Sequence, residues 1–529
     1  MAQKRRSFLV VSFMIAACAL AGGLYGPRVG VASAASNEDD VKGSVKIFTK
    51  AYDLVERNFA DPLSPDKAIY KGAIPGMLRT LDPHSNFFDP HEFNLMKEEQ
   101  KGHYYGVGMS VQGRNGKTVV MAPFTGSPAY KAGLRPGDVI VAVNGKSTDN
   151  LTSTEVADLL KGPRNTPVKI SVLREGSAKP LDFDVVRDEI NRKSVQDAMW
   201  LKPGIAYMQI EMFAETTGRE VEDNLQRLGE SNIKGLVLDL RQNPGGLLSE
   251  AVSVSDKFLA KGDTIVSHRG RASAERVYRA SNGNHGNEYP IVVLVNRYSA
   301  SAAEIVSGAL QDHDRAWILG DNTFGKGLVQ TVYPLIENTG LALTTAKYYT
   351  PSGRLIQRDY TNTSFFDYYY KTNTEARNLS DVKMTDGGRT VYGGGGISPD
   401  EKYAPPKLDK FEIELIRKYA LFNFTRHYFG THDVKLPKGW EPDAAILTDL
   451  HDYLMKEGVT FTEAEFTQDH DWVKRSLQKE MYVTAFSIDD SREFDIKTDP
   501  MVEKAIEALP RAQALLQSAK KIIVQRMSK

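Results

Sequence analysis

The feature that most constrains this chain is a series of short, mainly apolar runs that alternate with helical patterns between residues 192 and 403. Strands buried on both faces of a parallel sheet have this composition, because helices cover the sheet on both sides. The region therefore predicts an α/β layer with a mostly parallel sheet. The expected strands are residues 204–210, 235–240 and 291–295, and the expected helices are residues 217–228, 247–258 and 302–310.

Other periodicities surround this region. Residues 41–101 have helical spacing, whereas residues 102–188 alternate with a period of two and contain the hairpin signal Asn144-Gly145. Residues 360–390 are polar and tyrosine-rich without a clear period, which predicts a long loop. The rest is charged and helical, with helices expected over 411–422 and 501–526. We predict segments at 1–35, 41–101, 102–188, 192–403 and 407–529.

The N-terminus has the pattern of an export signal. Lys4-Arg5-Arg6 precedes an apolar run over residues 8–24, and the small residues 32–35 resemble a cleavage site. We therefore expect export to the periplasm or cell envelope. The sequence leaves open whether the segment is cleaved, retained as an inner-membrane anchor or lipidated at Cys18.

Composition excludes several classes of protein. The 67 basic and 67 acidic residues give no net charge, so no global field attracts nucleic acid. Apolar residues at 41% and charged residues at 25% exclude a polytopic membrane protein and a mostly disordered one. The single cysteine, Cys18, excludes a disulfide framework and a cysteine-rich zinc site.

Residues 102–188 resemble a PDZ domain. The resemblance lies in the order of a glycine-containing loop, Ser127-Pro128-Ala129, the run Gly-Leu-Arg-Pro-Gly-Asp over 133–138, and Val143-Asn144-Gly145. PDZ domains add a peptide as an extra strand and hold its terminal carboxylate with backbone N–H groups. The resemblance implies a peptide-binding loop made of Tyr105, Gly106, Val107, Gly108 and Met109.

Ser301 lies on a strand-to-helix turn of the α/β region. The geometry predicts a side chain at the sheet edge and an Ala302 amide directed at whatever binds there, which favours developing negative charge. Ser301 and Glu304 also match a capping box, so a purely structural role for Ser301 is the alternative. Gly245-Gly246 follow another buried strand, where they would let backbone amides approach a substrate or would simply form a turn.

With these motifs the sequence resembles the carboxyl-terminal processing proteases, also called tail-specific proteases. The similarity extends from the N-terminal helices to Gly394-Gly395-Gly396-Ile397-Ser398-Pro399-Asp400. It implies a multidomain α/β fold: a ClpP/crotonase-like catalytic domain, an inserted PDZ-like β domain and helical N- and C-terminal segments. Ala303 stands where many members have a third serine, a change that should not affect the catalytic pair.

The resemblance also implies residue roles. The nucleophile is the second serine of Ser-Ala-Ser, Ser301, and the general base is the lysine of Phe-Gly-Lys-Gly, Lys326. Gln330 would orient the lysine, and the oxyanion donors would be the amides of Ala302 and of Gly245 or Gly246. The implied substrates are proteins or peptides with accessible C-termini, and the implied activity is that of a serine endopeptidase without a cofactor.

Several alternatives remain open. His313 is the best rival general base, and a non-catalytic envelope scaffold that only holds peptide tails is the rival function. His84 and His91 have no third ligand at a useful spacing, so we expect no metal site. Gly320–Lys326 fits a phosphate-binding loop but lacks the following Ser or Thr and the following helix, so we expect no nucleotide. The sequence does not indicate an oligomeric state.

Overall fold

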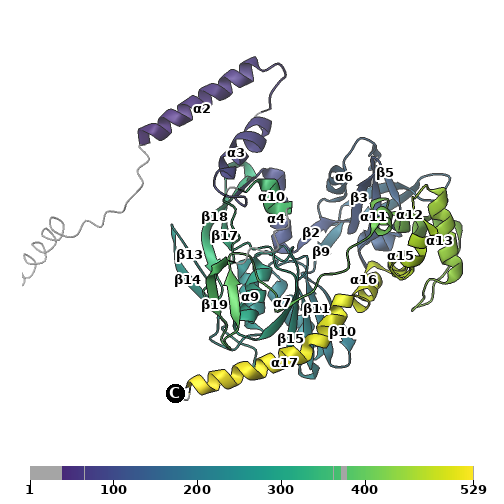
Figure 1. Cartoon of the computed structure of the whole chain (residues 1–529). Helices are drawn as coiled ribbons and strands as arrows, with labels where there is room; N and C mark the ends of the chain where they lie inside the picture. Colours follow the sequence, from purple (N-terminus) through teal and green to yellow (C-terminus); the bar gives the residue numbers. More distant parts are fainter. Residues whose placement is uncertain (1–37, 65, 362, 371–377, 528–529) are drawn as a thin grey trace, which may run out of the picture. The chain divides into compact units, whose positions relative to one another are not determined.

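The computed structural model describes residues 38–64, 66–361, 363–370 and 378–527. The chain divides into two compact units, Met1–Pro75 and Gly76–Lys529. The first contains helix α2 (Glu38–Asn58; Figure 1) and the π-helix η1 (Asp66–Ala73). The predicted export signal lies outside the described residues. None of the described helices has both the length and the apolar character needed to cross a bilayer.

A six-stranded sheet forms the centre of the second unit. Its order is β10-β11-β12-β15-β16-β21; β10 is antiparallel to β11 and every other pair is parallel. The structure thus confirms the predicted α/β class with a mostly parallel sheet. The strands are β10 (Val195–Lys202), β11 (Ile205–Ile210), β12 (Gly235–Asp239), β15 (Ile291–Val295), β16 (Ala316–Gly320) and β21 (Glu401–Lys402).

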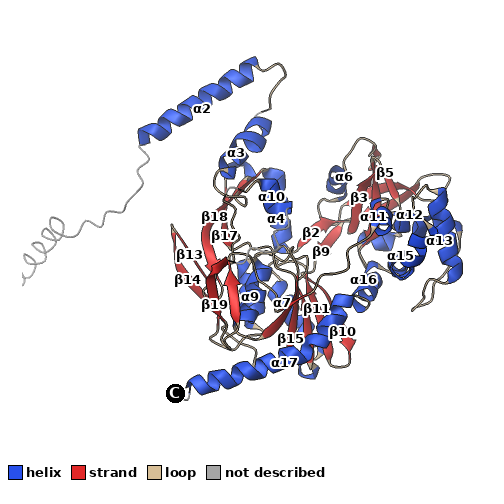
Figure 2. Ribbon diagram, viewed as in Figure 1, coloured by secondary structure: helices blue, strands red, loops and turns tan. Residues whose placement is uncertain are grey.

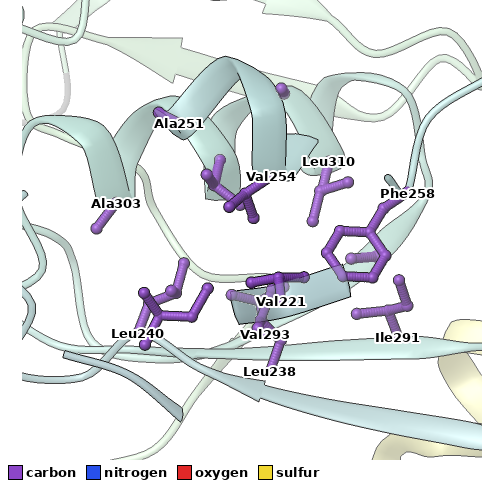
Figure 3. Close-up of a cluster of buried hydrophobic side chains, with 14 of the residues drawn as sticks. Val221, Leu238, Leu240, Ala251, Val254, Phe258, Ile291, Val293, Ala303 and Leu310 are labelled. Carbon is purple, nitrogen blue, oxygen red and sulfur yellow. The ribbon is translucent and has the colours of Figure 1, made fainter. Parts of the chain in front are cut away.

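Helices cover both faces of this sheet because its strands are apolar on both faces. On one face, Leu238 and Val293 pack against α7 (Thr217–Leu228), α8 (Leu248–Asp256) and α9 (Ala302–Asp312), as Figure 3 shows. On the other face, Val237 and Val292 pack against α17 (Pro500–Met527). Each fully buried aliphatic side chain contributes about 1.5–3 kcal/mol relative to an exposed one. The 3-10 helix η2 (Glu230–Asn232) follows α7.

A second, antiparallel sheet carries the other half of the candidate site (Figure 2). β17 (Leu328–Pro334) and β13 (Thr264–Gly270) both pair with β18 (Gly340–Tyr349). The remaining strands are β1 (Asn86–Phe88), which pairs with β18, and β14 (Ser273–Arg279), which pairs with β13. Helix α3 (Ile74–Arg79) precedes β1, α4 (Pro90–Lys101) follows it, and the 3-10 helix η3 (Ile336–Asn338) links β17 to β18.

The PDZ-like segment has its own sheet and core. Strands β2 (His103–Gly106) and β9 (Asp188–Asn191) pair with each other where the chain enters and leaves it. Its sheet has the order β3-β4-β5-β7-β8, with β6 added to β5. The elements are β3 (Met109–Arg114), β4 (Lys117–Pro123), α5 (Pro128–Ala132), β5 (Val139–Val143), β6 (Lys146–Ser147), α6 (Ser153–Leu160), β7 (Pro167–Leu173) and β8 (Leu181–Val186).

The C-terminal helices form a further core before α17 returns to the central sheet. Phe411, Phe424, Leu450 and Leu477 are among the buried residues that hold these helices together. The elements are α11 (Lys410–Arg417), α12 (Ala420–Thr431), α13 (Ala444–Lys456), α14 (Glu463–Gln468), α15 (His470–Ala485) and α16 (Ile488–Lys497).

The structure differs from the sequence-based expectations in three places. The helix expected over 411–422 is broken between α11 and α12, where Tyr419 has a left-handed φ of 50°. The expected long loop over 360–390 contains α10 (Phe365–Tyr370), held by its buried Tyr368, and the strand β19 (Asn378–Met384), and β20 (Thr390–Gly393) begins at its last residue. Residues 86–88 of the expected N-terminal helical segment form β1, because Phe87 is buried beside β18.

Candidate active site

Ser301 occupies a strained turn between β15 and α9. Its backbone has φ 54° and ψ −112°, a conformation that costs roughly 1–3 kcal/mol for a residue with a side chain. The surrounding contacts hold it: the Ala300 amide donates to the Asn243 carbonyl at 2.9 Å, and Ser299 Oγ donates to the Leu240 carbonyl at 2.8 Å. The Glu304 amide donates to the Ser301 carbonyl at 2.9 Å, and Ser301 and Glu304 form the expected capping box at the start of α9.

The two glycines after β12 approach this turn closely. A Cβ on Gly245 would lie 2.7 Å from Ser301 Cβ and 3.0 Å from the Ala302 nitrogen. With φ 101° at Gly245 and 143° at Gly246, both positions favour glycine on conformational grounds as well. The structure therefore brings Gly245 to the Ser301–Ala302 peptide, whereas a Cβ on Gly246 would meet the Phe213 backbone.

The amides of this turn differ in their availability to a substrate. The Gly245 amide donates to Asn243 Oδ1 at 2.8 Å. Among the described residues, no acceptor bonds the amide of Gly246 or of Ala302. Of the two glycines, Gly246 is thus the one whose amide is not engaged within the described residues.

A buried ion-pair network fixes the start of the glycine turn. Asp239 is fully buried and accepts from the Arg241 amide at 2.9 Å and from the Tyr207 hydroxyl at 2.8 Å. The Arg241 guanidinium bonds Asp239 and reaches Asp499 at the start of α17, 2.7 Å away. The turn is therefore fixed to the helix that covers the other face of the sheet.

Lys326 lies on the loop before β17, and its side-chain nitrogen forms a hydrogen bond with a neutral side chain. Nζ donates to Gln330 Oε1 at 2.9 Å, and Gln330 Nε2 donates in turn to the backbone carbonyl of His84. Burial lowers the pKa of Lys326, and the carboxylates of Glu304 and Asp82 act on that pKa in the opposite direction. The structure thus brings Lys326 and Gln330 together.

Glu304 links the nucleophile turn to the lysine loop. Its fully buried carboxylate accepts from the Ser301 amide at 2.8 Å, the Gly325 amide at 2.7 Å and the Lys326 amide at 2.8 Å. The Thr323 hydroxyl is a fourth donor, and burial raises the pKa of Glu304. The loop amides that resembled a phosphate-binding motif therefore bind a carboxylate of this chain.

Tyr348 of β18 makes a second link between the two loops. Its hydroxyl lies 3.1 Å from the Ser301 carbonyl oxygen and also contacts the Lys326 carbonyl. Burial raises the pKa of Tyr348 well above its usual value, so the hydroxyl remains a donor. Sequence reasoning missed this residue because it lies on a strand that carries no motif.

The turn Asp82–Ser85 is a component of the site that the sequence identified only as a turn. The amides of His84 and Ser85 donate to Asp82 Oδ1 at 2.7 and 2.8 Å, and Ser85 Oγ accepts from the Thr344 amide at 3.2 Å. These bonds fix the His84 carbonyl that holds Gln330. The Asp-Pro-His-Ser motif was the available signal, but it gives no indication of its partner 246 residues away.

The His84 ring belongs to an aromatic cluster with α10. Nε2 lies 2.8 Å from the Tyr368 hydroxyl and Nδ1 3.2 Å from the Tyr369 hydroxyl. Burial, aided by the charge of Lys326, lowers the pKa of His84 to about 4, so the ring is neutral at pH 7. In the described part of the chain, no group of three His, Cys, Asp or Glu side chains could hold a metal ion.

His313, the rival general base, lies away from Ser301 and is fully engaged. It follows α9, twelve residues beyond Ser301, which corresponds to about 18 Å of helix. Nδ1 bonds Asp386 and Nε2 bonds the Thr264 carbonyl, each at 2.7 Å. The structure contradicts this alternative, because neither ring nitrogen is available to a serine proton.

The glycine-containing loop of the PDZ-like segment presents two amides. The Val107 carbonyl accepts from the Ala129 amide at 2.8 Å, and the Gly108 carbonyl accepts from Ser127 Oγ at 2.7 Å, so both carbonyls are engaged. No acceptor in the described ranges bonds the amides of Val107 and Gly108. Successive free amides of this kind form an anion-binding site. Tyr105 is exposed, whereas Gly106 and Met109 are buried.

The α/β region and the PDZ-like segment each match a known protein family. Residues 204–363 match peptidase family S41, and residues 119–174 match the PDZ domain. A carboxy-terminal-processing protease of Bartonella bacilliformis is 42% identical over 327 residues, which cover 61% of this chain and 74% of that protein. The chain belongs to peptidase family S41.

Two further proteins similar to this S41 peptidase are also named C-terminal processing proteases. A carboxyl-terminal-processing protease of Synechocystis is 37% identical over 304 residues, 56% of this chain and 70% of that protein. Among solved structures, a photosystem II D1 C-terminal processing protease is 27% identical with a TM-score of 0.36, covering 69% of this chain and 94% of that one. The S41 chain is thus a serine peptidase of the carboxy-terminal-processing group with a PDZ domain.

Proposed function

We propose that this peptidase hydrolyses protein substrates by acyl transfer through Ser301, with Lys326 as the general base. The observation that carries the proposal is the Lys326–Gln330 hydrogen bond, made on a loop that Glu304 and Tyr348 link to the Ser301 turn. Burial lowers the pKa of Lys326, which favours the neutral amine that a general base requires.

The proposed reaction follows from the placement of these groups. Neutral Lys326 takes the Ser301 proton as Oγ attacks the scissile carbonyl carbon, and the amides of Ala302 and Gly246 stabilise the oxyanion. The resulting ammonium then protonates the leaving amine as the peptide C–N bond breaks. A water molecule, deprotonated by Lys326, hydrolyses the acyl-enzyme and restores Ser301.

The test uses an unfolded protein substrate with a C-terminal tag. Wild type should release fragments, whereas Ser301→Ala should lose at least about 10³-fold in rate. Ser518→Ala is the matched control, because Ser518 is an exposed serine on α17 whose Oγ donates to the Ala514 carbonyl. Cleavage by Ser301→Ala at the wild-type rate would contradict the assignment and support a scaffold instead.

We also propose that the Tyr105–Met109 loop captures the terminal carboxylate of the substrate. The amides of Val107 and Gly108 support this, as does the position of β3 at the sheet edge, where a peptide can add as a strand. Amidating the substrate terminus should weaken binding by about 1.5–3 kcal/mol, the usual contribution of a hydrogen bond to a charged group. Equal binding of free and amidated peptides to Ser301→Ala would contradict this role.

Export to the cell envelope is a separate proposal that rests on residues 4–6, 8–24 and 32–35. Fractionation of cells that produce the full chain, followed by N-terminal sequencing, tests it. Recovery of the intact chain in the cytoplasmic fraction would contradict it.

A further inference from the structure

The free edge of β3 sets the direction of any added peptide. A tail whose carboxylate lies at the loop before β3 and which pairs antiparallel with β3 has its upstream residues toward Arg114. β3 has six residues, about 20 Å at 3.4 Å per residue. The sixth or seventh residue from the substrate terminus therefore lies level with the β3–β4 turn.

A basic cavity of about 700 Å³ lies at this end of β3. The β3–β4 hairpin forms one wall, and α11, α12 and α13 of the C-terminal helices form the other, with aromatic side chains between them. Basic side chains dominate the charged groups of its lining. The charged lining residues are Arg114, Lys117, Arg417, Lys418, Arg426 and Glu457.

The cavity is held in shape by contacts between β3 and α12. The Arg114 guanidinium lies 3.7 Å from the Tyr419 ring centroid and 4.2 Å from that of Phe422. Gln112 Nε2 donates to the Tyr419 hydroxyl at 2.9 Å. Stacking on two aromatic rings stabilises the cation without neutralising it.

The charge of the lining is only partly compensated. Arg417 and Lys418 pair with Glu414, and Arg426 pairs with Glu175. Within the described residues, Arg114 and Lys117 have no ion-pair partner within 4 Å, and the buried Arg114 Nε and Nη1 have no acceptor. Glu480 on α15 attracts Arg114 electrostatically, but burial opposes its ionisation and raises its pKa.

We infer that this cavity binds acidic side chains of the substrate, about six to eight residues before its C-terminus. The inference rests on the proposed capture of the terminal carboxylate, and it adds a charge preference to it. The negative charge of an acidic segment is complementary to the positive charge of the lining, and the methylene groups of its side chains can pack against the aromatic walls. The C-terminal helices would thus contribute directly to substrate choice.

The experiment measures binding of fluorescent ten-residue peptides to the full chain carrying Ser301→Ala. All peptides share the same last five residues, and positions six to eight from the end are Glu-Asp-Glu, Gln-Asn-Gln or Lys-Lys-Lys. The acidic peptide should bind roughly 5- to 30-fold more tightly than the neutral one at low ionic strength. The difference should shrink in 0.5 M salt, where screening is strong.

Reversing the charge of a lining residue tests whether the preference for acidic peptides arises in this cavity. Lys117→Glu should abolish it or invert it toward the lysine peptide, whereas Lys146→Glu, on β6 of the same domain and outside the cavity lining, should leave it unchanged. A preference that Lys117→Glu does not alter, or equal binding of all three peptides, overturns the inference. Amidated versions of the same peptides separate the two proposals. If amidation does not weaken binding, tail capture is overturned. If amidation weakens binding but the three peptides bind equally, only the acidic subsite is overturned.

Discussion

Gln330 Oε1 accepts a hydrogen bond from Lys326 Nζ at 2.9 Å. The amide cannot rotate freely, because its Nε2 donates at the same time to the His84 carbonyl. The lysine is thus held by a neutral acceptor instead of a carboxylate. A neutral partner fixes the position of the amine without the strong electrostatic preference for the ammonium that a carboxylate would impose.

Lys326→Arg should be inactive in a folded protein. Arginine is cationic at every accessible pH and cannot accept the Ser301 proton. The rate of peptide hydrolysis should fall by at least about 10³-fold, as when other members of a catalytic unit are removed. Lys326→Met is the companion variant, since it removes the charge but keeps the length of the side chain, and it should be equally inactive. Activity of Lys326→Arg above a few per cent of wild type would exclude Lys326 as the base.

Gln330→Glu should move the pH dependence of hydrolysis upward. A carboxylate at this position favours the ammonium form and raises the pKa of Lys326, so the rising limb of kcat/KM shifts to higher pH. Gln330→Ala is the matched control: it removes the hydrogen bond without adding charge, so its rate should fall without an upward shift. A profile of Gln330→Glu that coincides with wild type would show that the lysine does not titrate in the rising limb.

Local sequence signals predicted the Ser301 turn and the glycine turn, whereas the roles of Lys326 and Gln330 came from the family resemblance. Ser301 follows a buried strand and opens a helix, and the glycines after β12 are required by a close approach that no side chain tolerates. Such features are visible within a few residues. The central parallel sheet was predictable for the same reason, because its buried strands are apolar throughout.

The supporting groups could not be predicted, since their partners are distant in sequence. Glu304 matched a capping box, which explains only its bond to the Ser301 amide and not its bonds to the Lys326 loop. The Asp82–Ser85 turn reads as an ordinary turn until β18 and Gln330 are placed beside it. The break at Tyr419 has no glycine or proline to signal it; there the packing of α12 decides the backbone.

Gly245→Ala should impair both activity and stability. The new Cβ would meet Ser301 Cβ at 2.7 Å and the Ala300 carbonyl oxygen at 2.8 Å, and φ 101° strains any residue with a side chain. We expect kcat to fall by more than about 100-fold through displacement of the nucleophile. The free energy of unfolding should fall by about 1–3 kcal/mol. Gly262→Ala is the control, because φ there is also positive (96°) but no atom of the described residues lies within 4 Å of the added Cβ.

Comparing Gly245→Ala with Gly262→Ala separates the effect of backbone strain from that of the steric clash. Both variants should lose stability in chemical denaturation, but only Gly245→Ala should lose turnover. Normal turnover by Gly245→Ala would mean that the glycine turn does not need to touch the nucleophile.

His313→Ala should change the stability of the protein without moving the rising limb of its pH–rate profile. Hydrogen bonds to Asp386 and to the Thr264 carbonyl outweigh the opposing effect of burial and raise the pKa of His313 to about 9. A folded pKa above the unfolded value of about 6.5 means that the charged ring stabilises the native state fully below pH ~6.5. That stabilisation is lost as the pH rises through about 9.

Chemical denaturation at two pH values tests whether the stabilisation by His313 falls as the pH rises. The loss caused by His313→Ala should be larger at pH 6 than at pH 10 by roughly 2–3 kcal/mol, because Asp386 is about half exposed and solvent screens the pair. Activity should rise with pH as in wild type, since both ring nitrogens are engaged at the end of α9 distant from Ser301. Loss of the rising limb in a folded His313→Ala protein would make the histidine the base and remove Lys326 from that role.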